Sequence, residues 1–542
     1  MHSFVARLVQ PGRANKTTVE REWQLSVATS AQLAQVRRWL ERYAQEGGIT
    51  IAKRERYVLT DDYLDTSDWR FYRAGVALRH RRVGEQRSEV TLKALNSTTP
   101  AFKTRWEASE HFSQRLTHTA LRAFFRSSRK TIARLVRDVA GAMPIERKFR
   151  VVNHRDEFQL RLGLSRITVA LDRFKVTAAA GSSSPHYRIE IELDSDSDEA
   201  GLAAVEEFVA KLQSVFRAVA SCQSKFAMGL QMCEAAPATV VQNFGEPATV
   251  AAAGANPLAM TLAYAVLREQ WAAFRANEAG ARLGADPEYV HRMRVATRRM
   301  RTALRVFRQL FPPQAQQIRS ELQWIARVLG AVRDIDVQQE RLWQWQTEGV
   351  PLDVAAVHSH LRRQWQRAHR KLIDAFNSRR YAKMVEQVEE FLRKPVEASP
   401  LALLPARQVL PSLILRLYAA VRECGDTLTA ASPPTAYHLL RIRIKRLRYV
   451  LEFSRHVYPA VAERFVPRLV EVQDVLGSYQ DAHVAIEWLS SQQKANGVHA
   501  RGAGYIERWR ATMDNARAQL PRLYRRIKGA AWMRVVEILD QE

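Results

Sequence analysis

The second half of the chain contains an internal duplication, and this feature constrains the possible folds more than any other. Residues 291–301 read HRMRVATRRMR and residues 438–448 read HLLRIRIKRLR, so both follow the pattern H-x-x-R-x-x-x-[RK]-R-x-R, 147 positions apart. The same offset aligns Asp334 with Asp481, and each aspartate follows a Leu-Gly pair. A register that holds from the basic motif to the aspartate predicts two copies of one helical unit.

Each basic motif gives a helix one cationic face and one apolar face, because side chains about one turn apart share a face. The cationic face consists of His291, Arg294, Arg298, Arg299 and Arg301 in the first copy and of His438, Arg441, Lys445, Arg446 and Arg448 in the second. The opposite side carries apolar residues, such as Met293 and Leu440, which suit packing against a core.

Two interpretations of these arginines stay open. An arginine-rich helix is often a solvated surface, since arginine is a good helix former. Neither motif contains Glu or Asp, however, so no i,i+4 pairing relieves the repulsion between like charges. Asp334 and Asp481 could compensate part of the charge, and guanidinium groups bind phosphate oxygens well. The motifs therefore favour an anion-binding surface.

The net charge of the whole chain agrees with this interpretation. There are 83 Lys and Arg against 56 Asp and Glu, a formal net charge of +27. Residues 256–542 carry +17 and the first 255 carry +10, so the excess is not a detachable tail. Such a balance predicts a polyanionic partner, which could be nucleic acid, an acidic membrane surface or a phosphate chain.

Several other classes of protein are disfavoured by the sequence. No apolar run approaches the ~20 residues of a membrane helix, and residues 1–16 lack the apolar segment of a signal peptide. The three cysteines form no disulfide framework or zinc pattern. We therefore expect a soluble, cytoplasmic protein that does not bind a membrane.

The chain divides at a segment rich in Ala, Val and Pro, which reads as a linker. The predicted order is an extension (1–16), an α+β domain (17–233), the linker (234–257) and an all-helical domain (258–542). Short alternating segments precede the linker, and helical periodicity dominates after it.

The alternating segments of the first domain place charges on one face of each predicted strand. Carboxylates occur in VEREWQL, ITVALDRF and YRIEIEL, and cations occur in VALRHRR, SEVTLKA and ERKFRVV. A single strand of this kind usually has a polar outer face. Taken together, the segments could instead line a closed barrel whose interior holds a metal ion and a phosphate ligand.

The duplicated helix followed by L-G-x-x-[RQ]-D resembles the CHAD domain, over roughly residues 256–542. The resemblance implies two four-helix bundles related by a pseudo-twofold axis. It also implies that the ten His, Arg and Lys residues of the two cationic faces line a channel for inorganic polyphosphate.

The first domain resembles the CYTH family, the triphosphate tunnel metalloenzymes, over about residues 17–233. The matching elements, in family order, are Glu20-x-Glu22, Tyr63–Thr66, Leu78-Arg79-x-Arg81, Thr91-Leu92-Lys93, Arg105-x-Glu107, Leu171-Asp172, Glu190-x-Glu192 and Ser224-Lys225. The resemblance implies an eight-stranded antiparallel barrel that hydrolyses inorganic triphosphate, as in bacterial triphosphatases that carry a CHAD domain.

The family also implies a role for each matching residue. The implied ligands of Mg²⁺ or Mn²⁺ are Glu20, Glu22, Asp172, Glu190 and Glu192, of which Glu20 and Glu22 would also be catalytic. The implied triphosphate-binding residues are Arg79, Arg81, Lys93, Arg105, Lys148, Arg150 and Lys225.

Two positions depart from the family pattern. The N-terminal signature is normally E-x-E-x-K, and Gln24 stands in place of the lysine, while Arg188 stands where a further glutamate is common. An alternative hypothesis follows, in which a weakened tunnel belongs to a polyphosphate-binding protein associated with granules. Nucleic-acid binding is less favoured, because neither basic motif contains an aromatic residue for base stacking.

Overall fold

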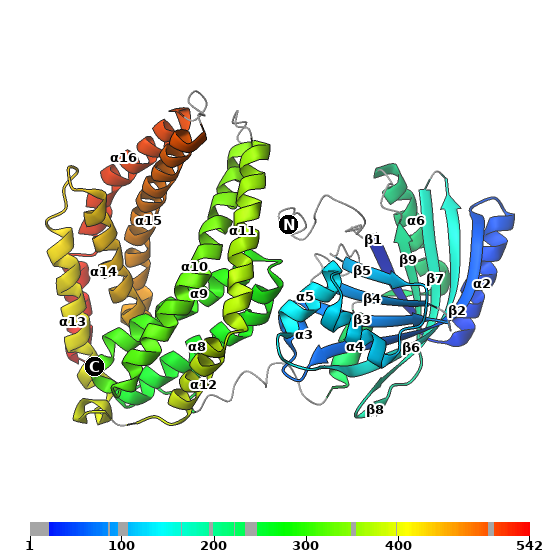
Figure 1. The fold of residues 1–542 in the computed structure, drawn as a ribbon, viewed down its shortest axis with the longest axis horizontal. Helices are drawn as coiled ribbons and strands as arrows, with labels where there is room; N and C mark the ends of the chain where they lie inside the picture. Colours follow the sequence, from blue (N-terminus) through cyan, green and yellow to red (C-terminus); the bar gives the residue numbers. More distant parts are fainter. Residues whose placement is uncertain are drawn as a thin grey trace. The chain divides into compact units, whose positions relative to one another are not determined.

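A computed structural model describes residues 21–84, 87–95, 107–163, 165–193, 199–221, 223–233, 246–347, 354–396, 398–496 and 503–541. The chain divides into two compact units, one made of residues 1–241 and 276–289 and the other of residues 242–275 and 290–542. The predicted extension (1–16) and residues 234–245 of the predicted linker lie outside the described residues. The predicted α+β class of the first domain and all-helical class of the second are confirmed (Figure 1).

The first unit is built around one antiparallel sheet. Its longer strands are β1 (Arg21–Val27), β2 (Thr50–Thr66), β3 (Val76–Val83), β4 (Arg87–Ala94), β5 (Glu107–Phe112), β6 (Ile145–Leu162), β7 (Ser165–Ala178) and β9 (His186–Leu193). The two-residue strands β8 (Gly181–Ser182) and β10 (Val219–Ala220) pair with β7 and β1. The order across the sheet is β10-β1-β9-β7-β6-β2-β3-β4-β5.

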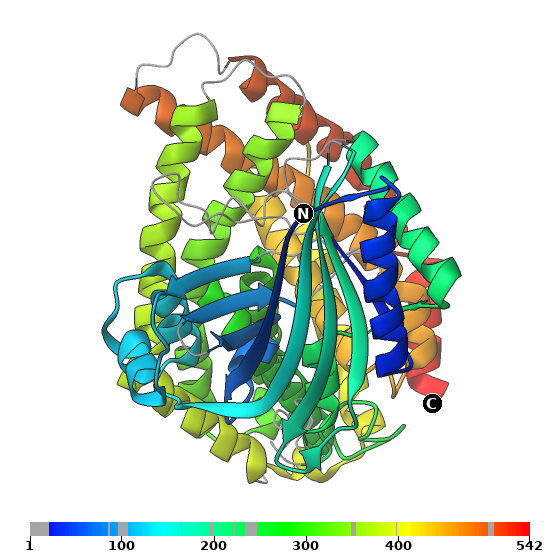
Figure 2. The same cartoon turned by 90° about the vertical axis from the view of Figure 1, so that its right-hand side faces the viewer.

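The eight longer strands match the number in the predicted barrel, but their pairing describes an open sheet. A closed barrel requires β5 to pair with β1, and within the described ranges these two strands have no such pairing. Both strands begin directly after residues outside the described part, at Arg21 and Glu107. The long strands β6, β7 and β9 curve strongly (Figure 2), so the sheet wraps around its own concave face.

Helices cover the apolar face of this sheet. The helices α2 (Ser30–Gln45) and α6 (Glu199–Phe216) pack on β1, β9, β7 and β6, and α2 begins with a capping box of Thr29 and Gln32. The helices α3 (Arg70–Arg73), α4 (His118–Ser127) and α5 (Thr131–Ala140) belong to a second core with β3, β4 and β5. A final helix, α7 (Lys225–Gln231), packs on β6 and β7 from the opposite, concave face.

Strict alternation explains which face of the sheet is which. On β9, Ile189 and Ile191 are fully buried beneath α2 and α6, while Glu190 and Glu192 line the cavity on the other face. Burying such an apolar side chain is worth about 1.5–3 kcal/mol, and a shift of register by one residue would turn the carboxylates into that core. The apolar face therefore fixes the direction of the charged one.

The chain from residue 259 onward is helical and repeats itself. The described helices fall into two sets of five: α8 (Ala259–Leu283), α9 (Pro287–Val306), α10 (Gln314–Thr347), α11 (Val354–Phe376) and α12 (Arg379–Arg393), then α13 (Ala406–Gly425), α14 (Pro434–Phe453), α15 (Pro459–Asn496), α16 (Ala503–Arg525) and α17 (Ala530–Gln541). The bounds of α9 and α14 differ by the 147 residues found in the sequence. Each set has four longer helices and one short final helix, which refines the predicted pair of four-helix bundles.

The apolar stripes of the two basic helices pack as predicted. Met293 and Met300 on α9 and Leu440 and Leu447 on α14 are at most 1% exposed. None of the helices in the described ranges combines the length and the apolar character needed to cross a lipid bilayer.

Candidate functional sites

The concave face of the sheet encloses a polar cavity of about 120 Å³. Its charged and amide-bearing lining residues are Glu22, Gln24, Arg79, Arg81, Lys93, Glu107, Arg155, Arg188, Glu190, Glu192 and Lys225. Strand pairing explains why they meet: Glu22 lies opposite Glu192 and Gln24 opposite Glu190, so these four side chains share one face of β1 and β9.

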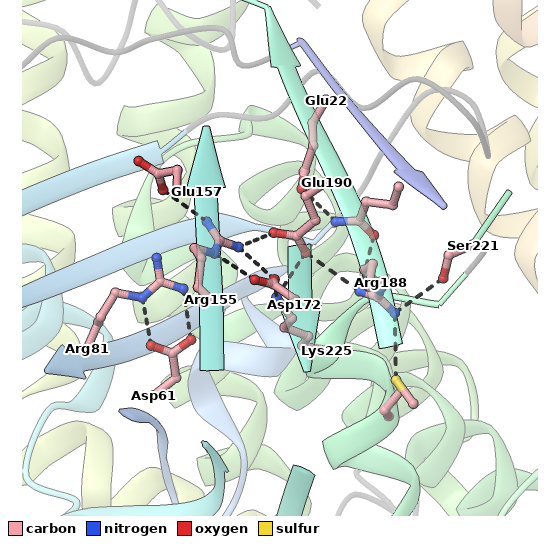
Figure 3. A network of polar contacts seen from close by, with 12 residues as sticks. Glu22, Asp61, Arg81, Arg155, Glu157, Asp172, Arg188, Glu190, Ser221 and Lys225 are labelled. Atoms are coloured by element: carbon pink, nitrogen blue, oxygen red, sulfur yellow. Dashed lines mark hydrogen bonds and ion pairs between the residues drawn. The ribbon is translucent and has the colours of Figure 1, made fainter. Parts of the chain in front are cut away.

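A buried ion-pair network lies at the carboxylate end of this lining. Arg155 on β6 donates Nε and Nη2 to the two carboxylate oxygens of Asp172, at 2.8 and 2.7 Å, and Nη2 also donates to Glu190. Lys225 Nζ on α7 donates to Asp172 Oδ2 at 2.5 Å and to Glu190 Oε1 at 3.0 Å. Figure 3 shows Arg155 and Lys225 reaching the same two carboxylates from different elements.

The network sets the protonation of its members. Burial alone would raise the pKa of Glu190, but the charges of Lys225 and Arg155 outweigh it and hold this pKa well below its usual range. The same balance lowers the pKa of Asp172. Burial acts in the opposite sense on Arg155, whose pKa is nevertheless raised by Asp172 and Glu190. The two carboxylates are therefore anionic and the guanidinium is cationic at neutral pH.

The cations at the other end of the lining are held by fewer carboxylates. Arg81 forms a bidentate pair with Asp61 on β2, at 2.7 and 2.8 Å, and Arg81 brings the pKa of the buried Asp61 down to about 2 against the effect of burial. Arg79 donates to Thr91 Oγ1 at 3.3 Å and lies 3.5 Å from Glu89. Lys93 Nζ lies 3.3 Å from Glu107. These cationic groups extend from β3 and β4 into the cavity and can bind the oxygens of a phosphate ligand.

The two departures from the family pattern lie side by side. Gln24 Nε2 donates to Glu22 Oε1 at 2.7 Å, and Arg188 Nη1 donates to Gln24 Oε1 at 3.4 Å. Arg188 is 3% exposed and is fixed by Ser221 Oγ at 3.2 Å and by the carbonyl of Gln223 at 2.8 Å. A buried guanidinium thus stands next to the position where the lysine is absent.

The cavity carboxylates fit a divalent cation in kind. Glu22, Glu190 and Glu192 supply the hard oxygen donors that Mg²⁺ and Mn²⁺ prefer. In the part of the chain that the structure describes, no group of three or more His, Cys, Asp or Glu side chains is arranged to hold an ion. Asp172 is fully buried between Arg155 and Lys225, so its oxygens serve the ion-pair network. Glu20 lies outside the described residues.

The structure does not bring two of the predicted phosphate-binding residues to the cavity. Arg150 lies opposite Asp62 on the other face of β2 and donates Nε to Asp62 Oδ1 at 2.6 Å. Lys148 Nζ donates to Glu146 at 2.7 Å and lies 5.0 Å from the centre of the Trp69 ring. The intervening residue, Phe149, turns inward and stacks on Tyr63.

Arg155 is a cavity-lining residue that the sequence motifs missed. It lies farther along β6, six residues after Phe149 and therefore on the same face of the strand. The sequence held one indication of this residue, namely the unusual length of the segment 151–166. The structure shows that β6 continues through this segment to Leu162, so the strand includes Arg155. Arg105, the remaining predicted cation, lies outside the described residues.

The helical unit contains a larger cavity, of about 850 Å³. Eight of the ten predicted polyphosphate-binding residues line it: His291, Arg294, Arg298, Arg301, His438, Arg441, Lys445 and Arg446. The aspartates of both copies, Asp334 and Asp481, also line it, and Asp334 lies 3.9 Å from Arg294. Three arginines that were not predicted also line it: Arg305, Arg319 and Arg333. Arg305 continues the cationic face of α9 one turn beyond Arg301, so its place could have been predicted from the sequence.

The other two predicted residues are engaged elsewhere. Arg299 Nη1 donates to Glu452 Oε2 at 2.6 Å, and Arg448 Nη1 lies 2.9 Å from Glu452 Oε1. Both guanidinium groups also lie over the ring of Tyr449, at 5.1 and 5.0 Å. One carboxylate and one aromatic ring therefore hold both arginines.

Lys445 has an unusual environment within the helical cavity. Burial and the charges of Arg298, Arg441 and Arg448 lower the pKa of Lys445 to about 7, although Asp481 acts in the opposite direction. An anion that enters the cavity would relieve this repulsion.

Comparison with protein families agrees with both units. Residues 41–226 match the family model of the CYTH domain, and residues 265–490 match that of the CHAD domain. Two uncharacterized proteins of Mycobacterium tuberculosis, from strains CDC 1551 / Oshkosh and H37Rv, are each 27% identical over 217 residues. That match covers 38% of this chain and only 40% of the length of each relative.

Among solved structures, the CHAD domain from the plant Ricinus communis is similar, with 21% identity, a TM-score of 0.40 and coverage of 55% of this chain and 97% of that one. A Hippeastrum protein, HpAC1, whose structure is described as revealing a dominant triphosphatase activity, is 16% identical with a TM-score of 0.30, over 40% of this chain and 98% of that one.

Proposed function

From a chain that contains a CYTH domain followed by a CHAD domain, we propose a metal-dependent triphosphatase with an accessory polyphosphate-binding domain. The observation that carries the first part is the composition of the 120 Å³ cavity, where carboxylates on β1 and β9 face cations on β3 and β4. A ligand that needs both sets at once is a phosphate chain with a bound divalent cation.

In this proposal the cationic residues bind the triphosphate and the carboxylates bind the metal ion. Arg79, Arg81 and Lys93 bind the non-bridging oxygens of inorganic triphosphate and stabilise the charge that develops on the transferred phosphoryl group. Bound Mg²⁺ or Mn²⁺ supplies further charge neutralisation, and Glu22, Glu190 and Glu192 would hold it. Water attacks the terminal phosphorus, the phosphoanhydride bond breaks, and phosphate and diphosphate leave.

Glu22 is the described carboxylate best placed to orient the attacking water. It is 5% exposed, lines the cavity and receives only the neutral amide of Gln24 among its hydrogen bonds to the described residues. Asp172 and Glu190, in contrast, are neutralised by Arg155 and Lys225. Glu20 belongs to the same E-x-E motif.

The triphosphatase proposal is tested by phosphate release from inorganic triphosphate with Mg²⁺ or Mn²⁺. The double variant Glu20→Ala/Glu22→Ala should lose at least about 100-fold in kcat/KM, which is the scale for removing groups that act in the transition state. Wild-type activity equal to that of the double variant would contradict the proposal. Nucleoside triphosphates belong in the same screen.

A second candidate function for the first unit is anion binding with little turnover. Gln24 favours it, because an amide supplies no charge where the E-x-E-x-K signature has a lysine. The protein would then act mainly through polyphosphate, in the cytoplasm and on polyphosphate granules. The variant Gln24→Lys separates the two candidates.

The second domain is proposed to bind polyphosphate in the 850 Å³ helical cavity, because cations of both copies line it. The full chain without metal should bind long polyphosphate, with an affinity that falls steeply as salt rises. Arg294→Ala/Arg298→Ala should weaken binding at least about 100-fold. The control Arg362→Ala/Arg363→Ala removes the same charge from residues that do not line the cavity. Equal weakening by both pairs, or equal competition by duplex DNA at matched salt, would contradict an organised site.

A further inference from the structure

Four arginines gather in one part of the helical cavity. Arg301 and Arg305 lie on the last turns of α9, Arg319 lies on α10 and Arg446 lies on α14, and all four line the cavity. We call them the arginine cluster. Arg319 is close enough to both Arg301 and Arg446 to lower the pKa of each, after the effect of burial, and Arg305 acts on Arg446 in the same way.

The arginine cluster has no acidic partner in the part of the chain that the structure describes. No ion pair joins any of its members to a carboxylate there, and the contact of Arg319 is with the neutral amide of Gln316, at 3.4 Å. The Nε atoms of Arg301 and Arg319 are buried without a hydrogen-bond partner. Several guanidinium groups with unused donors are costly to hold together unless an anion joins them.

The duplication supplies an internal comparison. The 147-residue offset relates Arg301 to Arg448, Arg305 to Glu452, Arg319 to Val466 and Arg446 to Arg299. At this second place Glu452 pairs with both Arg299 and Arg448, at 2.6 and 2.9 Å, and an apolar residue replaces the fourth cation. The positive charge around Glu452 is therefore partly neutralised, whereas the equivalent place, the arginine cluster, keeps four positive charges.

A linear phosphate chain has the matching asymmetry. An internal phosphate has two non-bridging oxygens and one negative charge, whereas a terminal phosphoryl group has three such oxygens and, like a phosphate monoester, carries about −1.5 to −2 near pH 7. Guanidinium forks gain most where oxygens and charge are densest.

We propose that the arginine cluster is a subsite for the terminal phosphoryl group of a phosphate chain, so that the helical domain recognises chain ends. This inference rests on the proposed polyphosphate binding and deepens it. The chain end is fixed at Arg301, Arg305, Arg319 and Arg446. The following internal phosphates extend toward Arg298 and Lys445, which also line the cavity.

The test compares a linear with a cyclic phosphate oligomer, because a ring has no terminal group. Linear and cyclic hexaphosphate are titrated calorimetrically against the full chain, without metal so that hydrolysis is prevented. All proteins carry Arg79→Ala/Lys93→Ala, which removes two cations from the cavity of the first unit. The parent protein should bind the linear oligomer at least about tenfold more tightly.

The decisive variant is Arg305→Glu, which copies the charge found at the equivalent position, Glu452. Arg305 is exposed, so the substitution should not disturb folding. It should abolish the preference for the linear oligomer. The matched control is Arg308→Glu, the same charge change at an exposed residue that does not line the cavity, and it should keep the preference. In the parent, the preference should shrink below about pH 6, where the terminal group takes up a proton.

The outcomes distinguish a failure of the proposed polyphosphate binding from a failure of the end-binding subsite. If neither oligomer binds, both the polyphosphate function and the end-binding subsite are wrong. If both bind equally well, the function stands and the subsite is wrong. A preference that survives Arg305→Glu would place end recognition elsewhere and would also overturn the assignment.

Discussion

Gln24 and Arg188 form a hydrogen bond of 3.4 Å between neighbouring strands, with the guanidinium donating to the amide oxygen. The same amide donates to Glu22 at 2.7 Å, so one neutral side chain joins a buried cation to a cavity carboxylate. Arg188 is 3% exposed and lines the cavity. The charge missing at position 24 is therefore present one strand away.

This relationship predicts a small effect of Gln24→Lys. The new ammonium would pair with Glu22 but would lie beside the Arg188 guanidinium, so the gain and the repulsion oppose each other. We expect kcat for triphosphate to change by less than about tenfold from an already active wild type. Steady-state kinetics with Mg²⁺ and Mn²⁺ measure this. A rise of more than about 100-fold from near zero would instead support the binding function without turnover.

The ion-pair network predicts a large stability cost for Lys225→Met. Lys225 is 8% exposed, and its removal leaves the buried Asp172 with Arg155 and the buried Glu190 with Arg155 and, at 3.9 Å, Arg188. Breaking a buried ion pair costs about 3–5 kcal/mol. The control is Lys53→Met, which removes a pair with Glu55 in which both side chains are exposed, and it should cost about 0–1 kcal/mol. Urea denaturation at pH 7 gives both free energies of unfolding.

The same network predicts how stability depends on pH. Asp172 and Glu190 have lowered pKa values in the folded protein, so their contribution is complete above the unfolded pKa of about 4 and is lost as pH falls through the folded pKa. Without Lys225 the folded pKa values rise, so Lys225→Met should begin to lose stability at a higher pH than wild type. Thermal melts between pH 3 and pH 7 test this shift. Parallel curves for the two proteins would contradict it.

Most of the fold was predictable because the two periodicities are strong. Period-two alternation, as in Ile189-Glu190-Ile191-Glu192, fixes a strand with one apolar and one charged face. The 147-residue repeat gives α9 and α14 the same bounds relative to their motifs. Closure of the sheet was not predictable in this way, since pairing between distant edge strands leaves no local pattern.

The site was less predictable on β6. Lys148 and Arg150 alternate with Phe149 as a charged inner face should, yet the structure turns Phe149 inward. Arg150 is paired in regular register with Asp62 and so lies on the outer face, while the shift in pairing between Tyr63 and Leu64 leaves Lys148 without a partner on β2. The motif ERKFRVV alone does not tell which of its two alternating faces is turned inward. The pairing of Arg299 with Glu452 was also hidden, because the residues are 153 positions apart.

The outward direction of Arg150 predicts which cations matter for triphosphate. Arg79→Ala and Lys93→Ala should each raise KM or lower kcat/KM at least about tenfold, since each removes a charged group from the cavity lining. Arg150→Ala removes a cation that binds Asp62 on the opposite face, so kcat/KM should stay within about threefold of wild type. Comparable losses for all three variants would contradict the placement of Arg150.

The helical cavity predicts a pH dependence that belongs to one residue. Lys445 has a pKa of about 7 because of burial and of the neighbouring Arg298, Arg441 and Arg448, with Asp481 opposing them. Bound polyphosphate brings negative charge to this group and raises its pKa, so binding above pH 7 must take up a proton. Affinity should level off below about pH 7 and fall by up to about tenfold per pH unit between pH 7 and pH 9.

Lys445→Arg removes the titration but keeps the charge, because a guanidinium stays protonated throughout this range. Its affinity for long polyphosphate should therefore be nearly constant from pH 7 to pH 9, while that of wild type declines. Calorimetry in buffers of different ionisation enthalpy should detect uptake of close to one proton per site at pH 8 in wild type and none in the variant. Lys445→Met should bind more weakly at pH 7 and also show no proton uptake, which distinguishes loss of charge from loss of titration. A decline with pH that is equally steep in wild type and Lys445→Arg would assign the titrating group to another side chain.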